Sequence, residues 1–228
     1  MWKRARKIFL KIIFWFLNLS IFFVIFFRFI PVPVTPLMLI RCIEQKSNGI
    51  EAKLSYDWVS LDKISTVMPL AVMAAEDQNF EEHFGFDIEA IKKAEKYNEN
   101  HKGGKMKGAS TISQQTAKNV FLWPSRSWIR KGFEVYFTFL IEIIWSKKRI
   151  MEVYLNVIET GNGIYGVEAA SQYYFHKAAS KLNIYEASRL ASILPDPRNW
   201  SPVHPTPRIL KKSQRIIQFM GKLKTENF

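Results

Sequence analysis

The sequence contains few of the residues that usually build disulfide or metal sites. Its 228 residues include one cysteine, Cys42, and four histidines. A single cysteine excludes an internal disulfide framework and any metal site made of several cysteines. The histidines form no His-Glu-x-x-His motif. We therefore expect no metal centre built from histidine and cysteine.

The sequence also lacks the glycine-rich loops that bind nucleotide phosphates. The stretch GGKMKG (103–108) does not end in the Lys-Ser or Lys-Thr of a Walker loop. No G-x-G-x-x-G follows a predicted strand. Because both phosphate-binding signatures are missing, nucleotide-driven chemistry is not expected.

Acidic residues are absent from two long stretches. Residues 1–30 hold six Lys or Arg and no acid, and residues 102–133 hold seven and no acid, in a chain of formal net charge +13. This balance favours an anionic partner: a nucleic acid, an anionic membrane surface or a phosphorylated substrate. Charge alone does not distinguish these three.

A long apolar run stands near the N-terminus. Ile8 to Phe27 form a segment of twenty residues whose only charged member, Lys11, lies near one end. As a helix it would be about 30 Å long, which matches the hydrocarbon core of a bilayer. A cleaved signal peptide is the alternative, but the bulky and proline-rich FRFIPVPVTP that follows contains no small-residue cleavage site.

The basic residues before this run place the N-terminus in the cytoplasm by the positive-inside rule. The domain should therefore lie outside the cytoplasm. We predict a cytoplasmic tail (1–7), a transmembrane helix (8–30), a proline-containing linker leading into the domain (31–55) and one globular domain (56–228).

The domain is predicted to be all-α. Apolar residues recur at helical spacing in five segments after Val67, and strand alternation is nearly absent. The aromatic segment 121–145 is too charged to span a bilayer. Its second half suits a core helix. For its first half we expect a surface in the membrane interface, formed by Phe121, Leu122, Trp123 and Trp128.

Two acids interrupt an apolar helix in the stretch AAEDQNFEEHFGFD (74–87). Partial burial of Glu76 at the helix end would raise its pKa and make it a usable base near neutrality. The alternative is that Glu76 and Asp77 simply begin a solvated loop. The stretch by itself leaves both interpretations open.

A second polar stretch, 103–119, precedes a predicted helix. Ser110 or Thr111 can cap this helix, which places two amides and a lysine on neighbouring faces one to two turns later. The acid-free basic run around it ends at Glu134. A solvated face is the ordinary explanation for such a run. Its interleaving with polar and aromatic residues instead favours a phosphate-binding wall beside a catalytic acid.

With these residues in view, the sequence resembles the peptidoglycan glycosyltransferases, the polymerase module of bifunctional penicillin-binding proteins. The resemblance covers about 100 residues and consists of motifs in the family's order: EDQNF (76–80) with His83, Gly85 and Asp87, GASTISQQTAKN (108–119), RKGFE (130–134) and KKRIMEVYLNVIETGNGIYGVEAASQYYF (147–175). The chain leaves no room for a transpeptidase domain, so it resembles the monofunctional form. The resemblance implies a lysozyme-like, two-lobed, all-α fold that polymerises the lipid-linked precursor lipid II.

The resemblance also implies roles for individual residues. Glu76 would be the general base and Glu134 a second carboxylate that assists departure of the diphosphate, directly or through a divalent cation such as Mg²⁺ or Mn²⁺. No cofactor is expected to be obligate. The residues implied in binding the substrate are Asp77, Ser110, Thr111, Gln114, Gln115, Lys118, Asn119, Arg126, Arg130 and Lys131. An inverting displacement predicts carboxylates about 6.5 to 9.5 Å apart.

The implied partners are lipid II, the lipid-linked glycan chain and membrane lipid, with no nucleic acid. The implied location is the bacterial inner membrane, with one span and an extracytoplasmic catalytic domain. Recruitment by other cell-wall synthesis or division proteins stays open. A lysozyme-like glycan-cleaving enzyme and a non-catalytic membrane scaffold are the alternatives. A cleaving enzyme would not need the cationic wall.

Overall fold

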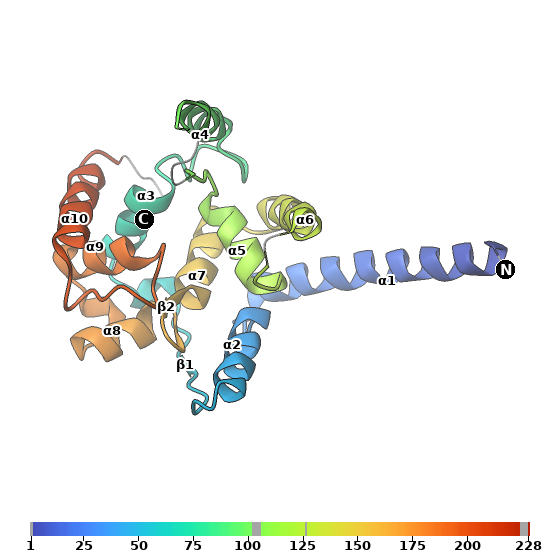
Figure 1. The fold of residues 1–228 in the computed structure, drawn as a ribbon, viewed down its shortest axis with the longest axis horizontal. Helices are drawn as coiled ribbons and strands as arrows, with labels where there is room; N and C mark the ends of the chain where they lie inside the picture. The colour runs from blue at the N-terminus through green and yellow to red at the C-terminus, as the bar shows by residue number, and fades with distance from the viewer. Residues whose placement is uncertain (1, 102–105, 126, 224–227) are drawn as a thin grey trace.

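The computed structural model describes residues 2–101, 106–125, 127–223 and 228, which form helices and one small sheet (Figure 1). The α-helices of this part are α1 (Trp2–Phe29), α2 (Pro36–Ser47), α3 (Val67–Glu76), α4 (Ile88–Asn100), α5 (Ile112–Phe121), α6 (Trp128–Ile144), α7 (Lys147–Val157), α8 (Val167–Phe175), α9 (Ile184–Ile193) and α10 (Pro207–Met220). The strands are β1 (Ser55–Tyr56), β2 (Glu159–Gly161) and β3 (Ile164–Tyr165). Single 3₁₀ turns lie at Leu61–Lys63 and Ala179–Lys181. The predicted all-α class is confirmed.

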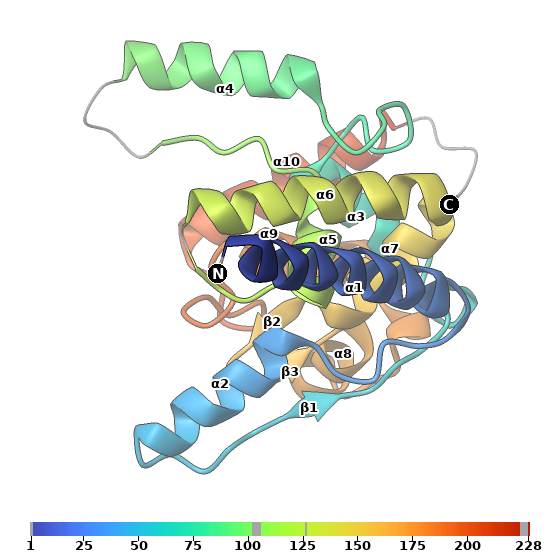
Figure 2. The same ribbon diagram turned by 90° about the vertical axis from the view of Figure 1, so that its right-hand side faces the viewer.

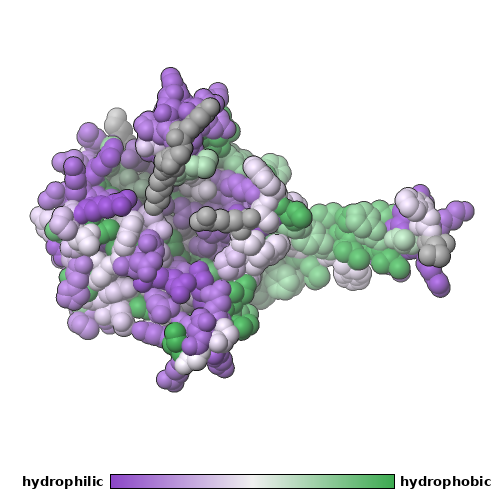
Figure 3. Space-filling model, in the orientation of Figure 1, coloured by the Kyte–Doolittle hydropathy of each residue, from purple (hydrophilic) through white to green (hydrophobic). Residues whose placement is uncertain are grey.

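Helix α1 projects away from the rest of the molecule (Figure 1). Within the described part of the chain it is the one helix long and apolar enough to cross a membrane. Its 28 residues give a length of about 42 Å. Apolar side chains cover most of its free surface, whereas the domain is mainly hydrophilic (Figure 3). The predicted apolar span is thus present as one continuous helix.

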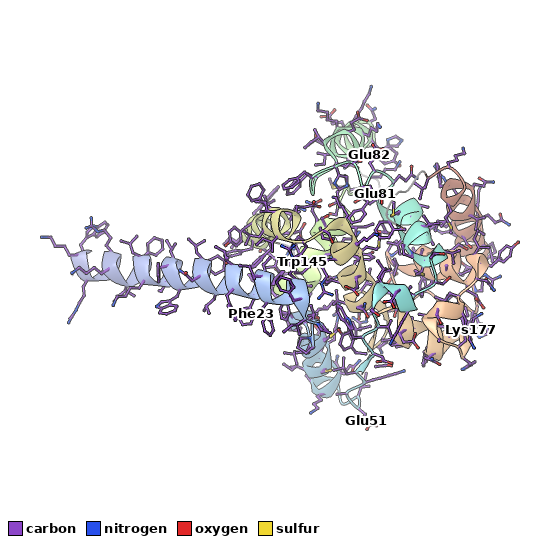
Figure 4. The ribbon with its side chains drawn as sticks, turned by 180° about the vertical axis from the view of Figure 1, so that it is seen from behind. Phe23, Glu51, Glu81, Glu82, Trp145 and Lys177 are labelled. Carbon is purple, nitrogen blue, oxygen red and sulfur yellow. The ribbon has the colours of Figure 1, made fainter. Side chains whose placement is uncertain are left out.

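The inner half of α1 packs against α6, which runs alongside it (Figure 2). The Ser20 and Tyr136 hydroxyls form a hydrogen bond of 2.7 Å. Trp145, at the end of α6, lies beside α1 (Figure 4) and donates from Nε1 to the Val24 carbonyl at 2.7 Å. These polar contacts between apolar surfaces fix the rotation of α1 relative to the domain.

Arg149 of α7 caps the C-terminal end of α1. Its Nη2 donates to the carbonyls of Phe27 at 2.7 Å and Ile30 at 2.6 Å, and its Nε also donates to Phe27. The last carbonyls of a helix have no partner within the helix, and a cation there also complements the helix dipole. Arg149 therefore joins α1 to the core of the domain.

Residues 31–55, expected to be a linker, contain helix α2. Thr35 caps this helix by accepting a hydrogen bond from the Met38 amide, and Pro36 occupies the first turn. Proline is favoured there because its fixed φ suits a helix start and its missing N–H has no intrahelical partner. The prolines thus separate two helices and start the second one. Helix α2 packs against α5.

The domain has two groups of helices with α7 between them (Figure 1). Helices α3, α9 and α10 pack on one another, and α5 packs on both α6 and α7. Helix α3 is apolar almost all round, and most of its side chains are buried. A helix of this kind has no solvated face. It therefore belongs inside, and Glu76 is its last residue.

The sheet was not predicted, because its strands are only two or three residues long. Strand β3 pairs in parallel with β1 and antiparallel with β2. Asn156 supports this region by donating from Nδ2 to the Val59 carbonyl and accepting from the Val59 amide. The sheet brings residue 159 to the side of the domain that also contains α2.

The membrane-interface prediction for the first half of segment 121–145 was wrong for Leu122, which is buried. Phe121, the last residue of α5, is half-buried. It stacks on Phe137 of α6 with ring centroids 4.5 Å apart and lies 6.3 Å from the ring of Phe27 in α1. Trp123 and Trp128 are exposed, by 42% and 92%.

Gly166 and Gly49 have similar backbone conformations but different surroundings. Comparing alanine substitutions at the two positions tests the packing between α7 and α8. Gly166 has φ +79°, and a Cβ there would lie 2.4 Å from the Asn156 carbonyl oxygen. Gly49 has φ +72° and open space around it. We expect Gly49→Ala to lower the free energy of unfolding by about 1 to 2 kcal/mol from backbone strain. Gly166→Ala should cost roughly 2 kcal/mol more, because backbone atoms must move.

The measurement is chemical unfolding of the detergent-solubilised chain, followed by circular dichroism. Equal losses for the two variants would contradict the close approach of α7 and α8.

Candidate active site

Glu76 lies at the C-terminal end of α3, where the apolar helix reaches the surface of a cavity. Its Oε2 accepts a hydrogen bond of 3.0 Å from Nε2 of Gln115 on α5. Burial raises the pKa of Glu76, and the Gln115 hydrogen bond and the charges of Lys212 and Lys118 partly offset that rise. A carboxylate in this state can accept a proton near neutral pH.

Asp77, the next residue, has a different environment. It is buried, and its carboxylate accepts from the Ile112 amide at 3.0 Å and from Nε2 of His83 at 2.9 Å. These bonds hold the 74–87 loop against the start of α5. The two adjacent acids therefore have separate tasks. The expectation that Asp77 binds substrate stays a prediction.

The start of α5 is built by a capping box. The Thr111 hydroxyl accepts from the Gln114 amide at 3.2 Å, and the Gln114 side chain accepts from the Thr111 amide at 3.1 Å. Thr111 also donates to the Gly85 carbonyl. Both side chains satisfy backbone groups at the helix start. Thr111 is thus the cap, and Ser110 lies exposed beside the cavity next to Glu76.

Residues one turn further along α5 face a groove of about 490 Å³. Gln115, Lys118 and Asn119 line it together with Arg130 of α6. Burial lowers the pKa of Lys118, while the charge of Glu134 raises it. Four of the predicted substrate-binding residues therefore meet in one groove. Arg126, also predicted for this wall, lies outside the described residues.

Glu134 is only 3% exposed and lies between two cations of its own helix. Nη1 of Arg130 is 2.5 Å from its Oε2, and the Lys131 ammonium contacts its Oε1. Both oxygens are therefore engaged. The described residues contain no cluster of three potential metal ligands. Each oxygen of Glu134 keeps a further lone pair beside these contacts. A divalent cation near Glu134 therefore stays a prediction.

The two carboxylates are linked through Lys118. Glu76 lines a cavity of about 370 Å³, whereas Lys118 and Arg130 line the 490 Å³ groove. Glu134 lines neither space. The charge of Lys118 nevertheless interacts with both Glu76 and Glu134. Gln115 connects the two spaces, because it lines the groove and hydrogen-bonds Glu76.

Three charged residues at the site were missed by the sequence analysis. Lys212 of α10 donates to the Ser192 carbonyl at 3.2 Å and interacts with the charge of Glu76. Arg41 of α2 and Glu159 of β2 line the 490 Å³ groove. Lys212 stands in the basic stretch 208–224, for which a solvated helix face and a surface on anionic lipid are both open from the sequence, and Arg41 stands in the predicted linker 31–55. Glu159 lies within a recognised motif, which was the one available signal.

A mainly helical fold that places a buried carboxylate beside a cationic groove is an arrangement suited to glycosyl transfer. Comparison with known proteins agrees: the family model described as Transglycosylase matches residues 44–221. The chain belongs to this family and is a glycosyltransferase.

Relatives match nearly the full chain. The biosynthetic peptidoglycan transglycosylase of Bdellovibrio bacteriovorus is 52% identical over 216 residues, covering 95% of this chain and 86% of the relative. The protein of the same name from Bacteroides thetaiotaomicron is 53% identical, over 90% of this chain and 84% of the relative. The protein of the same name from Haemophilus influenzae is 47% identical, over 99% of this chain and 90% of the relative.

The hydrogen bond from Gln115 predicts a shift in pH dependence. It lowers the pKa of Glu76 by stabilising the ionised form. Gln115→Ala should therefore raise this pKa further. We expect the acid limb of the pH–kcat/KM profile to move to higher pH, whatever the loss in maximal rate.

Gln172→Ala is the matched control, because Gln172 donates to a different carboxylate, Glu168, at 2.8 Å. An acid limb that stays in place in the Gln115 variant would show that Glu76 does not control it.

Proposed function

We propose that this protein is a peptidoglycan glycosyltransferase that polymerises lipid II. It transfers the growing glycan from a polyprenyl diphosphate to the 4-hydroxyl of the N-acetylglucosamine of lipid II. The transfer inverts the anomeric centre and forms a β-1,4 link. The observation that carries this proposal is Glu76, a half-buried carboxylate whose hydrogen-bond partner Gln115 lines a groove together with Lys118 and Arg130. The relatives are named biosynthetic peptidoglycan transglycosylases, which supports the choice of polymer.

In this mechanism the acceptor occupies the cavity beside Glu76 and the donor occupies the groove. Glu76 takes the proton of the 4-hydroxyl as that oxygen attacks C1 of the donor sugar. The new C–O bond forms while the bond from C1 to the diphosphate breaks, and its electron pair leaves with the diphosphate. Lys118 and Arg130 neutralise the charge that develops on the leaving oxygens, which is a large contribution in such reactions.

Glu134 acts by holding cations in place. Its two oxygens are already occupied by Arg130 and Lys131, so it fixes the direction of Arg130 toward the groove. The diphosphate then binds cations whose positions are already fixed before it arrives. The mechanism needs no step through a metal ion.

The fold suits an enzyme whose substrate is anchored in lipid. Helix α1 serves as a single-pass anchor in the bacterial inner membrane, with its basic N-terminus in the cytoplasm and the domain outside. Helix α6, packed beside α1, also presents exposed apolar side chains: Trp128, Ile129, Val135, Phe139 and Ile143. This face would rest in the same leaflet. Helix α10 lies on the opposite side of the domain, away from α1 (Figure 1).

Recruitment by other cell-wall synthesis or division proteins stays a prediction, as does the absence of a nucleic-acid partner. Both concern surfaces outside the groove.

Replacement of Glu76 tests the proposed base. Glu76→Gln keeps the shape but cannot accept the proton, so polymer formation from labelled lipid II should fall about 10²- to 10⁴-fold. A raised pKa means that the folded state binds the proton more tightly than the unfolded state. Ionisation of Glu76 therefore lowers stability as pH rises past its ordinary range. The uncharged variant should unfold at an equal or higher temperature at pH 7.

Polymer is scored by its sensitivity to a muramidase. Polymerisation at the wild-type rate by a folded Glu76→Gln variant would refute the assigned base. A non-catalytic scaffold would show no polymer with either protein.

Replacement of Lys118 separates polymerisation from glycan cleavage. A polymerase must bind a diphosphate leaving group, so Lys118→Met should reduce polymerisation about 10²- to 10³-fold. A cleaving enzyme has no diphosphate to bind and should keep its activity on finished glycan. Lys181→Met is the control, because Lys181 is exposed in the 3₁₀ turn Ala179–Lys181. Glycan cleavage that persists without Lys118 would favour the lysozyme-like alternative.

A further inference from the structure

The groove that contains Lys118 has a second wall, which the established family match only partly covers. Arg41 of α2 and Glu159 of β2 line this wall. The family match begins at residue 44. Arg41 therefore precedes it, although its side chain reaches the same groove as Lys118 and Arg130. No role has been assigned to Arg41 or Glu159 above.

Two acids contact Arg41 at different distances. Its Nη1 lies 2.6 Å from Oε2 of Glu44, whereas its Nε lies 3.7 Å from Oε1 of Glu159. At 3.7 Å, Arg41 and Glu159 form an ion pair, but the distance is too long for a hydrogen bond. Within the described part of the chain, Arg41 Nε and Glu159 Oε1 are buried without any hydrogen-bond partner. Such groups are rare in folded proteins and are costly when left unpaired.

The two unpaired atoms are complementary. Arg41 Nε is a donor and Glu159 Oε1 is an acceptor. A separation of 3.7 Å lets a single oxygen lie about 2.8 Å from both. A hydroxyl group can accept from one and donate to the other at the same time, after a small rotation of the side chains that opens the pair to the groove.

The surroundings of the pair favour a sugar. Trp123 lines the same groove and is 42% exposed, which offers an aromatic face to the C–H side of a pyranose ring. Ser125 and Asn119 line it as well. A concave site with an aromatic surface and a few polar groups is the usual form of a small-molecule site. A diphosphate suits this wall poorly, because Glu44 and Glu159 already oppose the charge of Arg41.

The wall is electrostatically coupled to the catalytic cations. Burial raises the pKa of Glu159, and the charges of Arg41, Arg198 and Lys118 lower it. Glu159 thus lies within the field of Lys118 on the opposite wall. A ligand that contacts Lys118 through its phosphates can reach Glu159 through the adjoining sugar.

We propose that Arg41 and Glu159 form a sugar-recognition subsite that reads a hydroxyl of the donor saccharide, next to the cations that bind its diphosphate. This subsite rests on the proposed function, because it takes the donor to be a lipid-linked saccharide. It makes α2 part of the substrate-binding groove. The pair determines specificity for the sugar and does not take part in proton transfer.

The test compares binding of two probes to the full-length protein in detergent. One probe is a polyprenyl diphosphate without sugar, and the other is the same lipid diphosphate carrying the disaccharide. The double variant Arg41→Met/Glu159→Leu removes both charges together, so that no buried charge is left unpaired. It should weaken binding of the disaccharide-bearing probe about tenfold, the effect of losing one hydrogen bond to a charged group. Binding of the sugarless probe should not change.

Two further variants serve as controls. Lys118→Met should weaken binding of both probes, because both carry the diphosphate. Arg215→Ala, an exposed arginine on α10, should change neither. The thermal unfolding midpoint of the double variant shows whether it is folded, and Arg41→Lys provides a milder second variant.

Equal weakening of both probes by a folded double variant, or weakening of neither, would overturn the subsite. Failure of the proposed function would look different. In that case the wild-type protein would bind neither probe above the level of a detergent-only control and would form no polymer from lipid II.

Discussion

The hydrogen bond between Gln115 and Glu76 is the contact on which the account depends. It joins the end of the buried helix α3 to the middle of α5. An apolar helix that ends in a carboxylate must place that group where it is only partly solvated, which raises its pKa. Gln115, Lys118 and Lys212 oppose that rise, because each of them favours the ionised form of the carboxyl group.

The same helix α5 sets the distance between base and leaving-group cations. The capping box at Thr111 fixes where the helix begins, so Gln115 and Lys118 fall at defined angles from it. Lys118 then lies within the field of both Glu76 and Glu134. Asp77 secures this start through the Ile112 amide. One helix thus carries the amide that hydrogen-bonds Glu76 and the lysine that lines the groove.

A second constraint is the attachment of α1. Tyr136, Trp145 and Arg149 all hydrogen-bond groups in or just after α1, so α1 and the domain form one body. A flexible tether would let the groove rotate freely relative to α1. The observed contacts instead hold the groove in a fixed orientation to this helix, which in the proposed function is the membrane anchor.

Local signals accounted for most of the helices and part of the site. Apolar periodicity predicted α3, α4, α7, α9 and α10, and the polar run before α5 predicted a cap at Ser110 or Thr111. These features depend on residues within a few turns of one another.

The features that could not be predicted from the sequence depend on contacts between residues far apart in the chain. Phe121 stacks on Phe137, which is sixteen positions away in the chain. Arg41 and Glu159 meet only because α2 folds back on α5 while the small sheet places β2 beside it. Lys212 reaches the field of Glu76 through the packing of α10 on α3. No local pattern contains that information.

The most direct test of the central claim is a titration of the Glu76 carboxyl group itself. Carbon-13 labelling of glutamate, with the Glu76→Gln variant to assign the signal, would give its pKa in the folded full-length chain by NMR. The account predicts a pKa above the ordinary value of about 4.3, and a further rise when Lys118 is replaced by methionine. A pKa at or below the ordinary value, unaffected by Lys118, would contradict it.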